Sequence, residues 1–139
     1  MRIEESVTIL ASRERIWEVL IDVEHWHEWT ASITSIQKLD GAPLSLGSKV
    51  RIRQPRLREA IWAVTVFDPP NGFVWESHAI GVHSTGEHWI TQLAAGECHL
   101  VLKFLQTGLL SPVLSPFFAG LTRRYVQMES NGLKARCET

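Results

Sequence analysis

Residues 97–136 read ECHLVLKFLQTGLLSPVLSPFFAGLTRRYVQMESNGLKAR, and this stretch contains the two elements that decide the fold. Its first part alternates with a period of two, which is the pattern of a β-strand with one buried face. Its second part, after Gly108, changes to helical spacing. A strand followed by one long terminal helix predicts a curved sheet that can enclose a cavity. The inward positions of the strand are Cys98, Leu100, Leu102, Phe104 and Gln106.

The terminal helix is expected over about residues 111–136, and two starting points fit its sequence. Either Ser111 caps a helix with Pro112 in the first turn, or Ser115 caps one with Pro116 in that place. One stripe of the helical wheel is expected to face the sheet. The stripe consists of Phe117, Leu121, Tyr125, Met128 and Gly132, whereas Arg123, Arg124, Gln127, Glu129 and Lys134 lie elsewhere on the wheel.

Upstream of this stretch, the chain alternates as a series of strands. Period-two patterns predict strands at residues 3–9, at about 32–39 and from Lys49 onward, and residues 69–72 supply a hairpin turn. Residues 59–67 are apolar on both parities, so alternation leaves their inward face open. We favour the first of two choices, which are Trp62, Val64 and Val66 or Ile61, Ala63 and Phe67.

Two short helical segments are expected between the first and second strands. Ser12 offers a capping side chain for a helix that runs to about Ile21. The segment DVEHWHEWT then adds a short turn that holds Trp26 and Trp29.

Length and composition predict one domain over residues 1–139. Apolar residues make up 45% and charged residues 21% of the chain, and the formal net charge is -1. This balance gives no general attraction to nucleic acid or anionic lipid. No apolar run reaches the ~18 residues that span a bilayer, and no secretion signal precedes the first strand. We therefore expect a cytoplasmic protein without a nucleic-acid partner, either a monomer or a homodimer.

No motif for metal, cofactor or nucleophilic chemistry occurs in the sequence. Cys98 and Cys137 lie far apart, and His25 and His27 are two residues apart, which places them on different faces of a helix. Neither a nucleophile elbow nor a glycine-rich phosphate loop is present. We expect no metal site and no cofactor, and the sequence names no catalytic residue.

Four segments in this order resemble a known group of proteins. They are ERIWEVLIDVEHWHEWT (residues 14–30), GSKVRIRQP (47–55), FDPPNGFVWES (67–77) and YVQMESNGLKAR (125–136). Together they resemble the START-like helix-grip superfamily, especially small bacterial polyketide cyclase/dehydrase-like members. The resemblance implies an α+β helix-grip fold. Its curved antiparallel sheet of about seven strands wraps around a long C-terminal helix, and two short helices follow strand one.

The resemblance also implies an internal pocket lined by the inward strand faces, the segment that contains Trp29 and the inner face of the terminal helix. His88 shares its parity with Gly86 and Ile90, so it points inward, either to a ligand or to a neighbouring polar group. Tryptophans are abundant and offer rigid contact faces for planar or acyl ligands. The candidate ligand-binding residues are Trp29, Trp62, Trp75, His88, Leu102, Phe104, Phe117, Leu121 and Tyr125.

Basic residues cluster in and after the strand that begins at Lys49. The ordinary interpretation is a solvated, charge-protected strand face, and the alternative is contact with an anionic ligand headgroup at the mouth of the pocket. The basic residues are Lys49, Arg51, Arg53, Arg56 and Arg58.

Three functions fit these observations. The first is binding of a small hydrophobic or amphipathic molecule, such as a lipid, an aromatic or a polyketide-like compound. The second is a polyketide cyclase/dehydrase-like enzyme in which His88 or Tyr125 moves a proton. The third is a protein-interaction module with a filled core.

Overall fold

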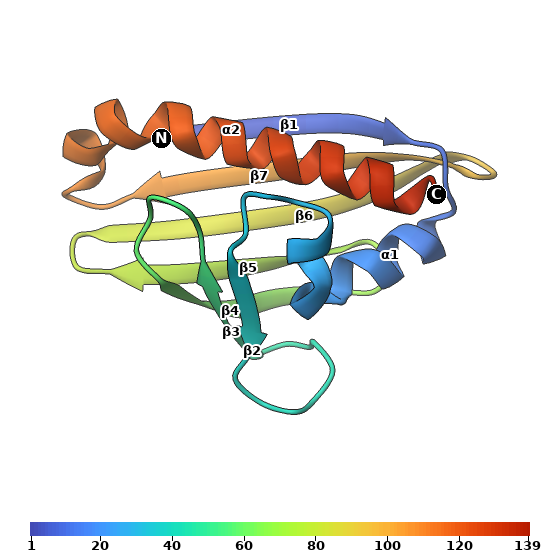
Figure 1. The fold of residues 1–139 in the computed structure, drawn as a ribbon, viewed down its shortest axis with the longest axis horizontal. Helices are drawn as coiled ribbons and strands as arrows, with labels where there is room; N and C mark the ends of the chain where they lie inside the picture. The colour runs from blue at the N-terminus through green and yellow to red at the C-terminus, as the bar shows by residue number, and fades with distance from the viewer.

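The computed structural model describes all residues, 1–139, and combines one curved seven-stranded antiparallel sheet with a long helix on its inner face (Figure 1). The order across the sheet is β1-β7-β6-β5-β4-β3-β2. The predicted α+β helix-grip fold is therefore confirmed. The strands are β1 (Arg2–Ile9), β2 (Ser35–Lys38), β3 (Lys49–Arg53), β4 (Ala60–Asp68), β5 (Gly72–Ala79), β6 (Val82–Ala94) and β7 (Glu97–Thr107). The helices are α1 (Arg13–Ile21), the 3₁₀ helix η1 (Val23–Glu28) and α2 (Ser111–Cys137).

The two short helices form as predicted and pack over only part of the sheet. Ser12 caps α1 by accepting a hydrogen bond from the backbone N–H of Arg15 at 3.1 Å. Ile16 and Leu20 are fully buried, and the indole N–H of Trp26 in η1 donates to the Leu20 carbonyl at 3.0 Å. No helix of the structure combines the length and apolar character needed to cross a membrane.

A β-bulge in β4 resolves the open parity of residues 59–67. The pairing of β4 with β5 shifts register between Val64 and Val66. Before the shift Val64 is buried, whereas after it Val66 is 43% exposed and Phe67 packs inward against the ring of Trp17. The choice of Trp62 and Val64 as inward residues is correct, and the choice of Val66 is wrong, because the extra residue reverses the alternation.

Helix α2 begins at Ser111, so Pro116 lies inside its first turns. Ser111 is not the cap: the capping position is Leu110, and the Ser111 hydroxyl donates to the Gln106 carbonyl at 3.1 Å. The second half of α2 is tied to β1, where the Lys134 ammonium donates to the Thr8 carbonyl at 2.7 Å.

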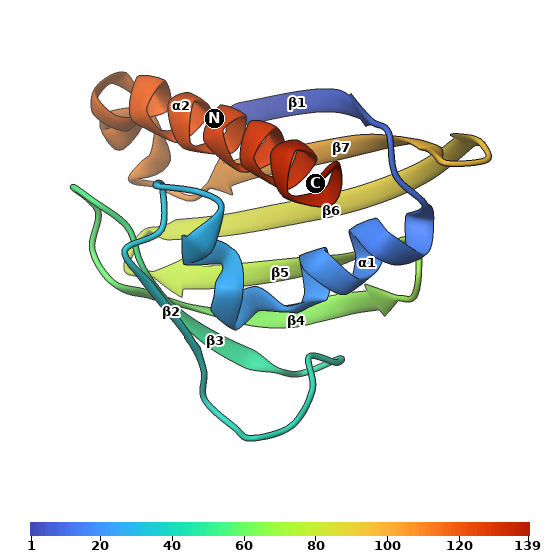
Figure 2. The same ribbon diagram turned by 45° about the vertical axis from the view of Figure 1, so that its right-hand side comes forward.

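The molecule has two unlike ends (Figures 1 and 2). At one, which we call the closed end, α1, η1 and the second half of α2 cover the sheet. At the other, which we call the open end, the β3–β4 loop (residues 54–59), the β5–β6 turn (80–81) and the first half of α2 come together without a further helix between them.

Candidate functional site

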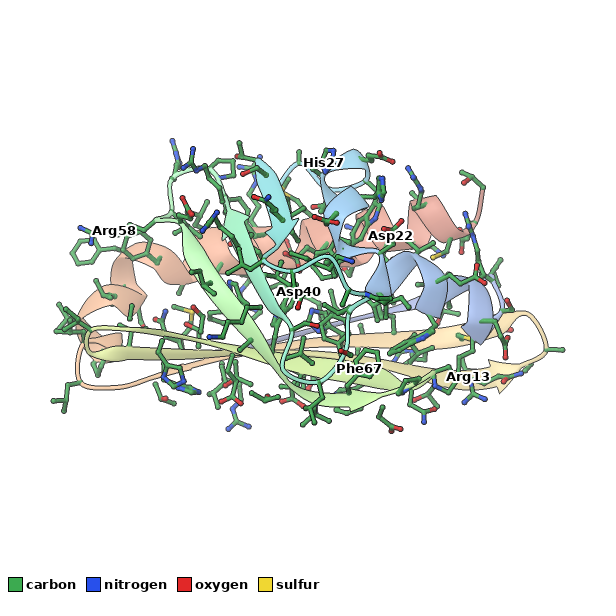
Figure 3. All side chains as sticks on the ribbon, turned by 90° about the horizontal axis from the view of Figure 1, so that it is seen from below. Arg13, Asp22, His27, Asp40, Arg58 and Phe67 are labelled. Atoms are coloured by element: carbon green, nitrogen blue, oxygen red, sulfur yellow. The ribbon has the colours of Figure 1, made fainter.

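A cavity of about 300 Å³ lies between the inner face of the sheet and α2. Among its lining residues, Arg58 and Glu59 in the β3–β4 loop and Ala79 at the end of β5 are exposed, whereas Trp75 and His88 further along the sheet are buried. Figure 3 shows Arg58 at the end of the molecule where α2 begins. The cavity therefore opens to solvent at the open end.

A chain of aromatic rings forms one wall of the cavity. Trp75 lies at its centre, with ring centroids 5.2 Å from Trp26, 5.9 Å from Trp62 and 5.2 Å from Phe73. The neighbouring strand carries Gly86 opposite Trp75, and a Cβ at this glycine would lie 2.9 Å from the indole nitrogen. The absence of a side chain at Gly86 thus leaves room for the indole of Trp75 at the cavity wall.

His88 is held inside as a neutral hydrogen-bond acceptor. It is 4% exposed and stacks on Phe73 with ring centroids 4.3 Å apart. Its Nδ1 lies 3.1 Å from the Phe73 carbonyl, which can only accept, so Nδ1 carries the proton and Nε2 carries the lone pair. Burial lowers the pKa of His88 to about 4, so the ring is uncharged at neutral pH. Nε2 has no hydrogen-bond partner in the protein.

Glu129 on α2 places a carboxyl group on the cavity wall. It makes no ion pair and no side-chain hydrogen bond, and burial raises its pKa to about 7. Near neutral pH the group therefore exists in both its protonated and its ionised form. The prediction that Glu129 lies away from the inner stripe of the helix is wrong.

Two further polar side chains on the wall differ in how they are satisfied. The Tyr125 hydroxyl donates to the Pro55 carbonyl and so ties α2 to the β3–β4 loop. The Oε1 atom of Gln106 is buried and has no partner. A ligand group that donates a hydrogen bond would satisfy the Gln106 oxygen, whereas the Tyr125 proton is already engaged.

The structure places most of the predicted ligand-binding residues on the cavity wall, although their role in binding stays a prediction. His88 also lies inside, as its parity predicted. The predicted residues that line the cavity are Trp62, Trp75, His88, Leu102, Phe104 and Tyr125, and those that do not are Trp29, Phe117 and Leu121.

The three exceptions have physical explanations. Trp29 packs on Trp26 at the closed end, with ring centroids 5.3 Å apart, and lines a separate polar depression of about 220 Å³. Phe117 is 78% exposed, because the stripe through Phe117 and Leu121 is one residue, or about 100°, away from the true inner face. The residues of α2 that do line the cavity are Leu114, Phe118, Thr122, Tyr125, Val126 and Glu129.

The basic cluster divides into paired and unpaired residues. Arg51 and Arg53 both bind the Glu59 carboxylate, at 2.7 and 3.0 Å. Arg56 and Arg58 in the following loop are exposed and make no ion pair. The paired residues fit the interpretation as a solvated strand face, whereas Arg58 lines the cavity at its mouth.

The metal-ligating residue types do not gather into a coordination site. No group of three His, Cys, Asp or Glu side chains is arranged to hold a metal ion. Cys98 and Cys137 are both buried as free thiols, and burial raises the pKa of each.

One family model matches nearly the whole chain. Residues 1–138 match the family model described as "Polyketide cyclase / dehydrase and lipid transport". A search of curated proteins finds no match.

Several solved structures share the whole fold. A Helicobacter pylori protein superposes with a TM-score of 0.84 at 14% identity, covering 99% of this chain and 88% of its own. The ZhuI aromatase/cyclase from Streptomyces sp. R1128 gives 0.79 at 20% identity, covering 99% and 93%. A START superfamily protein from Mycobacterium smegmatis gives 0.76 at 19% identity, covering 99% and 97%. At these identities the likeness supports the fold.

Proposed function

Because the chain belongs to the polyketide cyclase/dehydrase and lipid transport family, we propose that it binds a small amphipathic molecule in the internal cavity. The observation that carries the proposal is the cavity itself, about 300 Å³ in volume with an aromatic wall. This volume lies at the small end of the range for ligand pockets. The presence of this cavity argues against the interaction-module hypothesis, which requires a filled core.

The apolar wall accounts for affinity. Burial of ~200 Å² of apolar ligand surface at ~25 cal/mol/Å² contributes about 5 kcal/mol before the cost of association. Trp62 and Trp75 present flat faces that suit an aromatic ring or an extended acyl chain. By itself this contribution corresponds to a Kd of only about 0.2 mM, so hydrogen bonds to the polar atoms of the wall must add to the affinity.

The unpartnered polar atoms account for orientation. His88 Nε2 and Gln106 Oε1 can only accept a hydrogen bond, and the ionised form of Glu129 also accepts. The ligand class that satisfies them carries a hydroxyl, phenol or other donor on an otherwise apolar skeleton. A fully apolar molecule would leave these atoms desolvated.

Binding is tested first by native mass spectrometry of freshly purified protein, which would detect a co-purified small molecule. An apolar fluorescent dye should then quench tryptophan emission saturably and be displaced by fatty acids or aromatic polycycles. Absence of both a co-purified molecule and saturable dye binding would refute the proposal.

The role of His88 is tested with a shape-conserving substitution. His88→Phe keeps the ring stack on Phe73 but removes the acceptor, so it should weaken binding of a phenolic ligand by about 1 to 2 kcal/mol. Trp89→Phe is the matched control, because Trp89 follows in the strand and its N–H donates to Glu87. Equal affinity of the two variants would exclude a hydrogen bond from the ligand to His88.

One observation favours cyclase-like chemistry as a second candidate. A carboxyl group with a pKa of about 7 inside a cavity can take up and release a proton near neutral pH, which suits a general acid or base. This makes Glu129 a better candidate than His88, whose pKa is about 4, or Tyr125, whose proton is engaged by Pro55. Incubation with a poly-β-keto thioester analogue should give cyclised product that Glu129→Gln fails to form; unchanged substrate with the native protein would exclude this candidate.

A further inference from the structure

The first half of α2 is apolar on its outer face as well as on its inner face. Leu110, Val113 and Phe117 follow at i, i+3 and i+7 and are 42%, 59% and 78% exposed. The inner positions Leu114 and Phe118 line the cavity. No charged residue occurs between Lys103 and Arg123. A helix that is apolar all round is ordinarily buried in a core or in a membrane, and here the protein buries only one side.

Exposed apolar residues gather where the β5–β6 turn meets the start of α2. The Leu110 amide donates to the Gly81 carbonyl at 2.9 Å, so the β5–β6 turn lies against the start of α2. Ile80 in that turn is 95% exposed and Leu109 is 92% exposed. We call this surface the apolar rim; it consists of Ile80, Leu109, Leu110, Val113 and Phe117.

The charges beside the apolar rim are of one sign. Arg56, Arg58, Arg123 and Arg124 are all exposed, and none of them makes an ion pair or a side-chain hydrogen bond. The only acidic residue in the open-end segments, Glu59, is already bound by two arginines of β3. The net charge of -1 therefore averages a basic open end with acidic residues elsewhere, and the chain-wide balance conceals a local attraction for anions.

We propose that the open end docks on the surface of an anionic lipid bilayer, with the apolar rim inserted among the acyl chains and the four unpaired arginines against lipid headgroups. Protruding apolar side chains next to long basic ones match the interfacial zone of a bilayer, where arginines reach the headgroups while their neighbours enter the hydrocarbon. The cavity mouth lies beside this surface, because Arg58, Leu114 and Phe118 line the cavity, so docking would bring the mouth close to the bilayer and give a poorly soluble ligand a short path. The passage of a ligand between bilayer and cavity rests on the proposed ligand binding, whereas the docking itself does not.

Docking is tested by vesicle flotation with phosphatidylcholine alone and with phosphatidylcholine containing phosphatidylglycerol. The native protein should float with the anionic vesicles at low salt and be released as salt rises. Phe117→Ser should lower the partition coefficient about tenfold or more, because one large apolar side chain no longer enters the hydrocarbon. The matched control is Leu93→Ser, since Leu93 is 55% exposed in the β6–β7 hairpin at the other end of the sheet; it should float like the native protein.

The electrostatic part has its own pair of variants. Arg123→Gln with Arg124→Gln should lower partitioning about fivefold for each arginine. Arg15→Gln with Lys49→Gln changes the net charge equally but away from the rim, and it should have much less effect. Circular dichroism would show that all variants are folded.

Three results would overturn the proposal. The first is failure of the native protein to float with anionic vesicles at low salt. The second is an equal loss of binding in the rim variants and their controls. The third is a native dimer, seen by analytical ultracentrifugation, that Phe117→Ser dissociates while vesicles are not bound; the apolar rim would then be a contact between copies of the chain. Because no ligand is added, these results are independent of the dye-binding test.

Discussion

The two halves of α2 belong to one continuous helix, yet they meet the rest of the protein in opposite ways. A Cβ added at Gly132 in the second half would lie 2.0 Å from the carbonyl oxygen of Trp29. A Cβ added at Gly120 in the first half would meet nothing within 4 Å. The second half is pressed onto η1, whereas the first half stands away from the sheet and forms one side of the cavity (Figure 2).

This difference shows where the cavity comes from. The inner face of the sheet is apolar near the closed end but carries Ser77, Ser84 and Gln106 near the open end, and α1 and η1 reach only the closed end. There the core is solid, and at the open end one helix alone covers the sheet. The residues that are at most 1% exposed at the closed end include Ile9, Ile16, Leu20, Leu100 and Leu133. The hollow therefore follows from the fold's connectivity, and small residues on its sheet wall, such as Ser77, Ser84 and Gly86, add to the space.

The largest effect is expected for Gly132→Ala. The new methyl group would overlap the Trp29 backbone, which cannot rotate away as a side chain can. We expect a loss of about 4 kcal/mol in the free energy of unfolding, measured by urea denaturation, because α2 must shift off η1. Asn131→Ala at the exposed neighbouring position is the control and should be nearly neutral. An unchanged urea midpoint for Gly132→Ala would mean that the close approach does not exist.

The next largest effect compares two leucines of α2. Leu133→Ala, at a site 1% exposed in the solid end, should cost about 3 to 4 kcal/mol. Leu114→Ala, on the cavity wall, should cost about 1 kcal/mol, because its side chain already borders empty space. Thermal or urea unfolding of both variants measures the difference. Equal losses would argue that the two ends are packed to the same degree.

The third test uses the two titrating groups on the cavity wall. Burial raises the pKa of Glu129 from 4.5 to about 7, so this group makes the protein less stable as pH rises through that range. Burial lowers the pKa of His88 from 6.5 to about 4, so this group makes the protein more stable as pH rises from 4 to 6.5. Between pH 4.5 and 6.5 the contributions of Glu129 and His88 to the free energy of unfolding therefore change in opposite directions.

Glu129→Gln removes one of these opposed contributions. The variant should equal the native protein in stability at pH 4 and exceed it at pH 8 by up to about 3 kcal/mol, because no desolvated carboxylate then remains. Urea denaturation at several pH values measures the divergence. Glu18→Gln, on the exposed face of α1, serves as the control. A variant that is less stable than the native protein at pH 8 would show that the Glu129 carboxylate is stabilised by a partner.

The sequence predicts the inward residues well in some elements of the fold and poorly in others. Alternation in β7 and β6 placed Leu102 and His88 inside, because strands with one buried face carry a strong signal. The β4 bulge reversed the parity of Val66, since an inserted residue leaves no mark in a segment that is apolar on both sides. In the first half of α2 the predicted inner stripe is one residue away from the observed one. Phe117 and Phe118 are adjacent, and no charged residue there marks the solvent face, so the sequence does not show which phenylalanine points inward.

Glu129 was missed for a related reason. A charged residue is assigned to the solvent face of a helix unless a partner is visible, and Glu129 has none. Only the three-dimensional arrangement shows that the face it shares with Val126 and Thr122 lies against a cavity. The spacing of residues 114, 118, 122 and 126 could have identified it. If these residues are taken as the inner stripe, in place of the stripe that starts at Phe117, Glu129 lies on the same face.

The smallest expected effect is a gain in stability, and it tests the open half of α2 directly. At Gly120 the helix is exposed and no neighbouring atom lies within 4 Å of an added Cβ, so Gly120→Ala meets no obstacle. Alanine is favoured over glycine in a helix interior by about 1 kcal/mol, because it loses less backbone entropy on folding. The variant should unfold at a correspondingly higher urea concentration with an unchanged slope. The same glycine-to-alanine change thus has opposite signs at two positions of one helix, twelve residues apart. A destabilised Gly120→Ala variant would show that the outer side of the first half of α2 packs against a further surface, and the contrast between the two glycines would then fail.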